Sequence, residues 1–497
     1  MGVLSEIKPE KVFEFFELIS SVPRGSSNTK AVSDIVVEFA KERGLECYQD
    51  ELNNVIIKKP ASSGYEEHEP VIIQGHLDMV CAKTEDTRID MKRQPITLLH
   101  DDNYVYADCT TLGADDGIAV AMAMAVLDAD DLKHPPIEAV FTVDEETGMD
   151  GAKGINAELL KGRVLLNIDS EEEGIFTCGC AGGCGISSEM EVKRLCDDSG
   201  KKVTSDELLR YLHYEVIIDG FLGGHSGVDI DKHRLSATHK LGSVLFEINR
   251  ECPILLTHIQ GGFFDNVIAD KATALVAVEP ENDELFNSLI EEFNDKIADE
   301  YKEDDPDGSL KAVKIDELKL SFSHEPLDRA STDRVLSSIY YLPQGISKMS
   351  DTMPGLVQTS SNLGIIRMER NCFKFSASVR SSVKNEKEQL IEEIVDLVDT
   401  LDGKSTLHGD YPGWEFKKES KLRDICVEVY KKQYDENPEV VAIHAGLECG
   451  LFMEKLDGLD AISFGPDIFD IHTPDEKLSI ASTQRVWNML KGILEKL

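Results

Sequence analysis

Acidic side chains and histidines follow several apolar segments of the chain, each at the point where the segment ends. The motifs are GHLD, LGADDG, VDEETG, LNIDSEE and FDIHTPDE, and they contain His76, Asp78, Asp115, Asp116, Glu145, Glu146, Asp169 and His472. In open α/β sheets ligands bind beyond the carboxyl ends of the strands, so these side chains could converge there. Imidazole and carboxylate ligands suit zinc, manganese or cobalt better than calcium. Two such ions, held by about five ligands with one bridging, could clamp an attacking water and a carbonyl oxygen.

Each of these motifs also has a plain structural explanation. A histidine two residues before an aspartate occurs by chance in many proteins, and His472 could simply precede a helix. Paired acids at a strand end are often solvated or cap a helix. The conjunction of the five motifs, each after a predicted strand, nevertheless favours a metal site.

The segment FTVDEETG places two glutamates, Glu145 and Glu146, side by side after an apolar run. A solvated loop would explain them. However, neighbouring residues at the end of a strand point in different directions. The pair is therefore interpreted as two carboxylates with separate tasks at one site.

The segments around these motifs alternate between apolar strands and helical patterns, which is typical of an α/β domain. Helices are predicted after Ser27 or Asn28, which would cap the first of them, and after Gly113. Near the C-terminus, TPDEKLSIASTQRVWNMLKGIL predicts one helix with Pro474 in its first turn.

Residues 186–403 are more polar and follow a different order of elements. Strand, helix, strands and helix succeed one another in 186–305 and again in 306–403, with Asn266 corresponding to Asn362. This pattern predicts an inserted α+β domain with a possible internal duplication. Residues 404–413 are interpreted as a linker. The expected catalytic domain is discontinuous and comprises 1–185 and 404–497.

Composition excludes several partners. The 497 residues carry a formal net charge of −41, which should repel nucleic acid and anionic membranes, although solubility alone would also explain it. The N-terminus has no apolar signal core, and the run at 118–127 is too short to span a bilayer.

Eleven scattered cysteines predict reduced thiols in the cytoplasm. Cys178, Cys180 and Cys184 could form a metal site, but without a second CxxC pair a structural role is favoured.

As a set, the motifs resemble a known family. GHLDMV, LGADDGIA, DEETGMDGAKG, LLNIDSEEEG, GGHSGVDI and FGPDIFDIHTPDEKL are similar to those of the di-metal amidohydrolases related to aminoacylase and carboxypeptidase G. PRGSSNT, CGCAGG and HAGLECGLF narrow the resemblance to the aminoacyl-histidine (Xaa-His) or cytosol non-specific dipeptidases. The resemblance covers nearly the whole chain. It implies a catalytic α/β domain with a mixed sheet flanked by helices, interrupted by a lid domain.

The resemblance also implies a ligand set for two divalent metal ions, zinc first, with cobalt or manganese as alternatives. His76 and Asp169 would bind one ion, Glu146 and His472 the other, and Asp115 would bridge them.

Further residues acquire catalytic roles through the resemblance. Asp78 would hold the far nitrogen of His76, as metal-binding histidines usually require. Glu145 would take a proton from the attacking water, which separates its task from that of Glu146. Asp116 adjoins a peptide bond expected to be cis.

Residues of the lid are assigned to substrate by the same resemblance. His225 would stabilise the oxyanion, although a loop histidine between glycines is the plain alternative. Arg380 would grip the terminal carboxylate of the substrate, a task that suits a planar guanidinium. Asn266 would contact the substrate as well. Glu448 either meets the substrate's amino group or is merely an acid at a helix start.

The predicted function is hydrolysis of Xaa-His and other dipeptides with a free C-terminal carboxylate, by a monomer or homodimer in the cytoplasm. Alternatives are a related aminoacylase, deacetylase or carboxypeptidase, and an inactive binding scaffold. The stretch PDIFDIH departs from the expected smaller residues, and Asp470 and Ile471 could reshape the pocket wall. The preference for histidine is therefore open.

Overall fold

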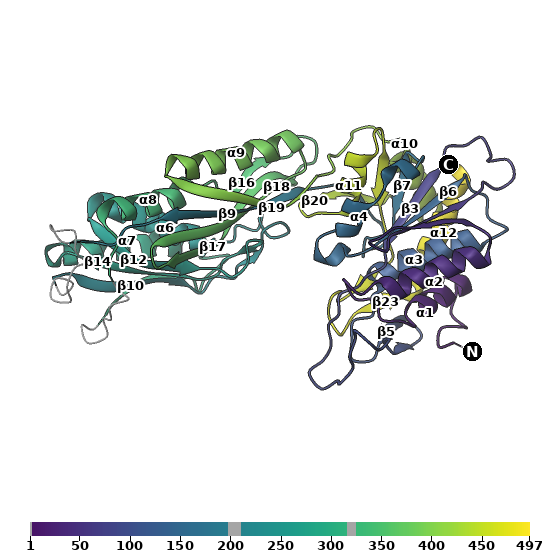
Figure 1. Ribbon diagram of the computed structural model, residues 1–497, viewed down its shortest axis with the longest axis horizontal. Helices are drawn as coiled ribbons and strands as arrows, with labels where there is room; N and C mark the ends of the chain where they lie inside the picture. Colours follow the sequence, from purple (N-terminus) through teal and green to yellow (C-terminus); the bar gives the residue numbers. More distant parts are fainter. Residues whose placement is uncertain (1, 197–209, 316–324) are drawn as a thin grey trace. The chain divides into compact units, whose positions relative to one another are not determined.

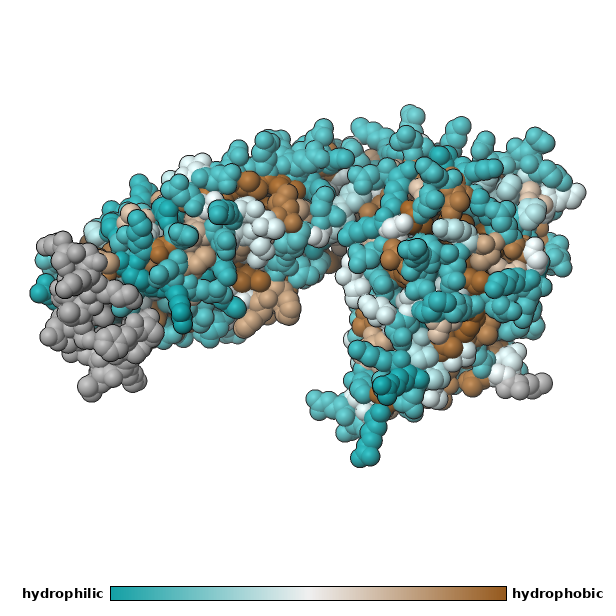
Figure 2. Space-filling model, viewed as in Figure 1, coloured by the Kyte–Doolittle hydropathy of each residue, from teal (hydrophilic) through white to brown (hydrophobic). Residues whose placement is uncertain are grey.

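Two separate sheets organise the chain (Figure 1). The structure, a computed structural model, describes residues 2–196, 210–315 and 325–497. One unit contains Met1–Cys180, Trp414–Ala442 and Leu447–Leu497, and the other contains Ala181–Gly413 and Ile443–Gly446. Hydrophilic side chains are spread over the visible face of each unit (Figure 2), in keeping with the net charge of −41.

The first unit is built on an eight-stranded mixed sheet. Its strands, in spatial order, are β1 (Glu46–Gln49), β2 (Val55–Lys59), β6 (Ile137–Thr142), β3 (Val71–His76), β7 (Val164–Asn167), β21 (Asp460–Ser463), β8 (Ile175–Cys180) and β20 (Glu439–Ile443). The central strands β6, β3, β7 and β21 are parallel, so their carboxyl ends lie at one edge. Every residue of β3 and β6 is buried, which explains why their sequences are nearly continuous apolar runs.

Helices cover this sheet. They are α1 (Glu10–Ile19), α2 (Lys30–Glu42), α3 (Ala114–Asp128), α4 (Asp150–Gly154), α10 (Lys421–Tyr434), α11 (Glu448–Lys455) and α12 (Ile480–Lys496). The alanine-rich helix α3 packs between β3 and α1, and α1, α2 and α3 lie together on one side of the sheet (Figure 1). A small sheet joins β22 (Ile468–Phe469), β23 (Lys477–Ser479), β5 (Tyr104–Ala107) and β4 (Leu98–His100).

The second unit is a nine-stranded antiparallel sheet with helices packed on it. The strands are β15 (Ser309–Lys314), β10 (Leu212–Asp219), β14 (Ala272–Val278), β12 (Ile254–Gly261), β17 (Val357–Glu369), β18 (Cys372–Ser381), β9 (Gly182–Glu191) and β19 (Gly403–Tyr411), with β16 (Gly345–Met349) beside β17. The helices are α6 (Ala237–Glu251), α7 (Asp283–Tyr301), α8 (Arg329–Tyr341) and α9 (Lys384–Thr400). A short ribbon pairs β11 (Gly224–His225) with β13 (Val267–Ile268).

The α/β fold with a separate α+β unit confirms the predicted fold class. An internal duplication stays a prediction, because the two sequence halves share one continuous sheet in which β15 lies beside β10 and β9 beside β18. The assignment of the units as catalytic and lid domains also stays a prediction. The alternating segment KIDELKLSFS, residues 314–323, predicts a strand from its sequence, but it lies mostly outside the described residues.

Three local predictions are wrong. Residues 404–413 are not a linker, because Gly403–Tyr411 forms strand β19 on β9. The last helix begins at Ile480 rather than near Pro474, since Lys477–Ser479 pairs with β5 and Ser479 caps the helix. Helix α2 has Thr29 rather than Ser27 or Asn28 at its N-cap, and it makes no side-chain cap. Within the described ranges, no helix combines the length and apolarity needed to cross a membrane.

Candidate active site

The predicted metal ligands lie at the carboxyl edge of the first unit's sheet. His76 ends β3, Asp169 follows β7 by two residues, and Glu146 lies in the turn Glu145–Thr147 after β6. Asp115 is the second residue of α3, and His472 lies between β22 and β23. The structure therefore brings together residues that are up to 396 positions apart (472 − 76).

Asp115 lies between the two histidines. Its Oδ1 is 3.1 Å from Nε2 of His76, and its Oδ2 is 3.1 Å from Nε2 of His472. Nε2 of His472 is also 3.0 Å from Oε1 of Glu146, and Nε2 of His76 is 3.6 Å from Oδ1 of Asp169. Each oxygen of Asp115 thus faces one histidine, and the peptide bond between Asp115 and Asp116 is cis, as expected.

The electrostatics of this cluster reflect crowded carboxylates. Burial raises the pKa of Asp169 to about 6 and that of Glu145 well above its usual value. Hydrogen bonds to Asp115 and Glu146 raise the pKa of His472 to about 10. Burial alone would lower the pKa of His76, but hydrogen bonds to Asp115, Asp169 and Asp78 raise it well above its usual value. A positive charge placed among these carboxylates would reduce the repulsion between them and favour their ionised forms.

The donor set fits divalent metal ions. Three groups of side chains have ligand atoms that all lie within 4.8 Å of one another: His76 with Asp116 and Asp169, His76 with Glu145 and Glu146, and Asp115 with Glu146 and His472. Imidazole nitrogen mixed with carboxylate oxygen is the chemistry of zinc, manganese and cobalt sites. Asp116 is already engaged, because its Oδ2 accepts a hydrogen bond from the His76 amide at 3.2 Å.

Asp78 connects His76 to the glutamate pair. It is fully buried, and its Oδ1 lies 3.4 Å from Nδ1 of His76, which also lies 3.1 Å from the Asp78 carbonyl oxygen. The same carboxylate accepts hydrogen bonds from the Glu145 amide at 3.2 Å and the Glu146 amide at 3.4 Å. Nδ1 of His76 is thereby occupied, and Nε2 faces Asp115.

The two glutamates have different surroundings. Glu146 contacts His472, whereas the Glu145 carboxylate makes no hydrogen bond or ion pair with any residue in the described ranges. The separate tasks inferred from their adjacent positions stay a prediction.

His225, Ser226 and Arg380 come together within the second unit. Arg380 on β18 is 8% exposed, and its Nη1 donates to the Tyr411 hydroxyl at 3.0 Å. Its Nε lies 3.4 Å from Oγ of Ser226, and its Nη2 lies 3.4 Å from Nε2 of His225. Within the described ranges, the side-chain partners of this buried guanidinium are Ser226, Tyr411 and His225, and none of them is a carboxylate.

The hydrogen bonds of His225 define its tautomer. Its Nδ1 accepts from the amides of Gly227 at 3.2 Å and Val228 at 3.1 Å, so the ring proton of the neutral form resides on Nε2. Burial and the nearby Arg380 lower the pKa of His225, which keeps the ring neutral. Two donors, Nε2 of His225 and the Arg380 guanidinium, therefore face each other without an acceptor between them.

Asn266 is exposed and lies directly before β13. Its carbonyl oxygen accepts a hydrogen bond from the Ser226 amide at 2.9 Å. This contact places its backbone beside the segment that carries His225. Its proposed contact with substrate stays a prediction.

Comparisons with known proteins identify the family. The pattern of peptidase family M20/M25/M40 matches residues 72–496. This chain belongs to peptidase family M20/M25/M40. Over 497 residues, all of this chain and 99% of the relative, it is 32% identical to the cytosol non-specific dipeptidase of Escherichia coli K12.

Solved structures agree with this assignment. The aminoacylhistidine dipeptidase of Vibrio alginolyticus superimposes with a TM-score of 0.91 at 33% identity, covering 99% of this chain and 98% of the other. A tripeptidase from Staphylococcus aureus has a TM-score of 0.58 at 15% identity, with 99% and 98% coverage, and shares the fold.

In this M20-family peptidase, several residues that support the site received no role from the sequence. Arg24 is buried and donates from Nη1 to the carbonyls of Leu77 at 3.1 Å and Asp78 at 3.2 Å. Glu476 accepts hydrogen bonds of 2.8–3.0 Å from three successive amides at the start of α3, those of residues 112–114. Arg24 lies in the motif PRGSSNT and Glu476 in the motif TPDE. Their position in these motifs could have indicated a supporting role, because charged residues are seldom buried without partners.

Two residues of the second unit of this M20-family peptidase were also missed. Tyr411 accepts the hydrogen bond from Arg380, and Nε2 of the buried His444 lies 2.7 Å from Oγ of Ser360. Tyr411 fell in the segment that was interpreted as a linker. No signal in the local sequence connects either residue to Arg380.

The cysteines of the CGCAGGC segment are packed in the interior. Burial raises the pKa of Cys178 to about 12 and that of Cys180 to about 11, so both are neutral thiols. No candidate metal group among the described residues includes them or Cys184. Their structural role stays a prediction.

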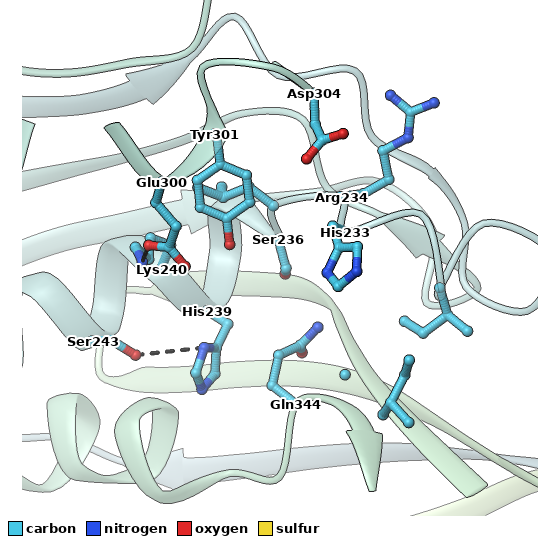
Figure 3. A pocket seen from close by; sticks show the side chains of 14 residues that line it. His233, Arg234, Ser236, His239, Lys240, Ser243, Glu300, Tyr301, Asp304 and Gln344 are labelled. Atoms are coloured by element: carbon cyan, nitrogen blue, oxygen red, sulfur yellow. Dashed lines mark hydrogen bonds and ion pairs between the residues drawn. The ribbon is translucent and has the colours of Figure 1, made fainter. Parts of the chain in front are cut away.

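A cavity of about 710 Å³ in the second unit contains none of the predicted site residues. It lies between α6, the end of α7 and the start of β16 (Figure 3). Its charged wall is partly self-neutralised, because Lys240 Nζ lies 2.9 Å from Oε2 of Glu300. His239 Nδ1 faces Ser243 Oγ at 3.5 Å, as Figure 3 shows.

Proposed function

We propose that the chain is a metal-dependent dipeptidase that hydrolyses Xaa-His and other dipeptides with a free C-terminal carboxylate. The observation that carries this proposal is the cluster in which Asp115 lies 3.1 Å from each of two histidines at the carboxyl edge of the sheet. The names of the full-length relatives, a non-specific dipeptidase and an aminoacylhistidine dipeptidase, support the substrate class. A cytoplasmic location is part of the proposal.

His76 and Asp169 would hold one divalent ion, Glu146 and His472 a second, and Asp115 would lie between them. Zinc is proposed, with cobalt or manganese as alternatives. Divalent ions held by these residues would lower the pKa of a water and polarise the carbonyl of the scissile bond.

Glu145 acts as the base. Its carboxylate accepts a proton from the attacking water as the water oxygen bonds to the carbonyl carbon. The same carboxyl then delivers the proton to the leaving nitrogen when the C–N bond breaks. Asp78 contacts Nδ1 of His76 and accepts hydrogen bonds from the backbone amides of Glu145 and Glu146. These contacts fix the positions of the base and the ligands relative to one another.

Arg380 grips the substrate's terminal carboxylate. Its support is a nearly buried guanidinium that has a tyrosine hydroxyl, but no carboxylate of the described chain, as its partner. A carboxylate from a ligand would supply the missing negative charge through two parallel hydrogen bonds.

Amidation of the substrate tests this function. Converting a good dipeptide to its C-terminal amide is expected to lower kcat/KM by about 2–5 kcal/mol, because the Arg380 charge then stays unpaired in a buried site. The measurement is steady-state kinetics on a dipeptide and its amide, with Arg380→Lys as a second arm. Comparable rates on the two substrates would refute the proposal.

His225 is proposed to donate from Nε2 to the oxygen that gains charge as the carbonyl becomes tetrahedral. His225→Ala is expected to lower kcat by about 10²–10³-fold with little change in KM, because such a donor acts mainly in the transition state. Half-buried His258 of the same unit provides a matched His→Ala control. A His225→Ala kcat within a factor of a few of wild type, at unchanged metal content, would show that His225 is only a loop residue.

A further inference from the structure

A buried carboxyl group lies beneath the strand ends that carry the predicted ligands. Glu448 is the first residue of α11 and is fully buried. Its Oε2 accepts a hydrogen bond of 2.6 Å from Nε2 of Gln74 and another of 2.6 Å from Oγ1 of Thr142. Gln74 in turn accepts a hydrogen bond of 2.7 Å from Nδ2 of Asn167. One side chain of α11 is thus joined to three parallel strands.

The partners of Glu448 are the polar residues nearest to the ligands along each strand. Gln74 precedes His76 by two residues in β3, so both side chains lie on the same face. Asn167 is the last residue of β7, two residues before Asp169. Thr142 ends β6 and is the register partner of His76, while Gln74 is the partner of Asn167. The hydrogen-bonded network is therefore formed by residues of β3, β6 and β7 that shortly precede the predicted ligands.

Complete burial argues against a contact between Glu448 and a substrate amino group. Burial also raises the pKa of Glu448 to about 8, so the group is a neutral carboxylic acid at lower pH. Its Oε1 is buried and has no hydrogen-bond partner among the described residues, and the same holds for Oδ1 of Asn167. A glutamine has the same shape as a neutral glutamic acid and can accept the same two hydrogen bonds.

We propose that Glu448 is a positioning residue that fixes the spacing of the β3, β6 and β7 ends, and through them the relative placement of His76, Asp169 and the glutamate pair. This inference rests on the proposed metal site. Loss of a residue that supports a metal ligand typically weakens metal binding by about 10–100-fold.

The test compares the zinc affinity of purified variants by competition with a chelator, alongside kcat, KM and the melting temperature of the metal-free protein. Glu448→Ala is expected to weaken zinc binding by about 10–100-fold and to lower kcat more than it raises KM. Glu448→Gln should restore zinc affinity to within about threefold of wild type, because it keeps both hydrogen bonds.

A second pair of variants keeps the test valid if Glu448→Ala fails to fold. Thr142→Val removes two hydrogen bonds of the network, the one that Oγ1 donates to Oε2 of Glu448 and the one of 3.2 Å that Oγ1 accepts from Nε2 of Gln74, and it should weaken zinc binding several-fold. The matched control is Thr483→Val in α12, which is also fully buried and loses one hydrogen bond, from Oγ1 to the Ser479 carbonyl at 2.8 Å. Thr483→Val should bind zinc like wild type.

The possible outcomes separate this inference from the proposed function. A wild-type enzyme without zinc and without dipeptidase activity would refute the proposed function itself. With an active, zinc-loaded wild type, unchanged zinc affinity in Glu448→Ala, or in Thr142→Val where Glu448→Ala does not fold, would refute the positioning role. If Glu448→Gln were as damaging as Glu448→Ala, the negative charge of Glu448 would be required and the positioning role would be overturned.

Discussion

Replacing Glu145 with glutamine is expected to slow dipeptide hydrolysis by roughly 10²–10⁴-fold, about 3–5 kcal/mol in the barrier, while the metals remain bound. Glutamine cannot accept the proton of the attacking water, but it has nearly the same shape. Among the described residues, the Glu145 carboxylate makes no hydrogen bond or ion pair, whereas Oε1 of Glu146 lies 3.0 Å from Nε2 of His472. The measurement is kcat and metal content for the same preparation of Glu145→Gln.

Glu146→Gln is the matched control, because it makes the same chemical change one residue further along the turn. It is expected to lose metal affinity, since its carboxylate is one of the proposed ligands. The assignment of the two roles fails if both variants lose metal equally, or if Glu145→Gln retains both metal and full turnover.

Removing the metals is expected to abolish activity, and adding zinc, manganese or cobalt is expected to restore it. Burial raises the pKa of Asp169 and of Glu145, and the negative charges of neighbouring carboxylates raise both pKa values further. Ions bound among these carboxylates relieve that repulsion, so the metal-free protein should also melt at a lower temperature. The assay is dialysis against a chelator followed by activity and thermal unfolding.

The control for this treatment is a chelator already saturated with zinc, which should leave activity unchanged. Full dipeptidase activity in protein shown by elemental analysis to contain no transition metal would contradict the account.

Much of the first unit follows from local sequence. Continuous apolar strands ending in acids or histidines predict a parallel sheet with polar side chains at its carboxyl edge, and β3, β6 and β7 have this form. The same rule predicted the gathering of His76, Glu146 and Asp169. Gln74 also indicates a buried hydrogen-bond network in the sequence, because a glutamine in a fully buried strand needs a buried partner.

The missed elements depend on partners that lie far along the chain. Residues 403–411 contain glycine and aspartate and are typical of a turn, but they pair with β9 more than 200 positions earlier. Lys477–Ser479 forms a strand only because β5 lies beside it, which delays the start of α12. The contact between His225 and Arg380 joins residues 155 positions apart on different strands, and no local pattern encodes that register.

The most direct test is the release of amino acids by the metal-loaded wild-type enzyme from a panel of matched substrates. The panel contains an alanyl-histidine dipeptide, other unblocked dipeptides, N-acetyl amino acids and longer peptides that end in histidine. The account predicts that kcat/KM for unblocked dipeptides exceeds that for N-acetyl amino acids and longer peptides by at least about tenfold, or 1.4 kcal/mol. Preferential hydrolysis of N-acetyl amino acids, or no hydrolysis of any dipeptide, would contradict it.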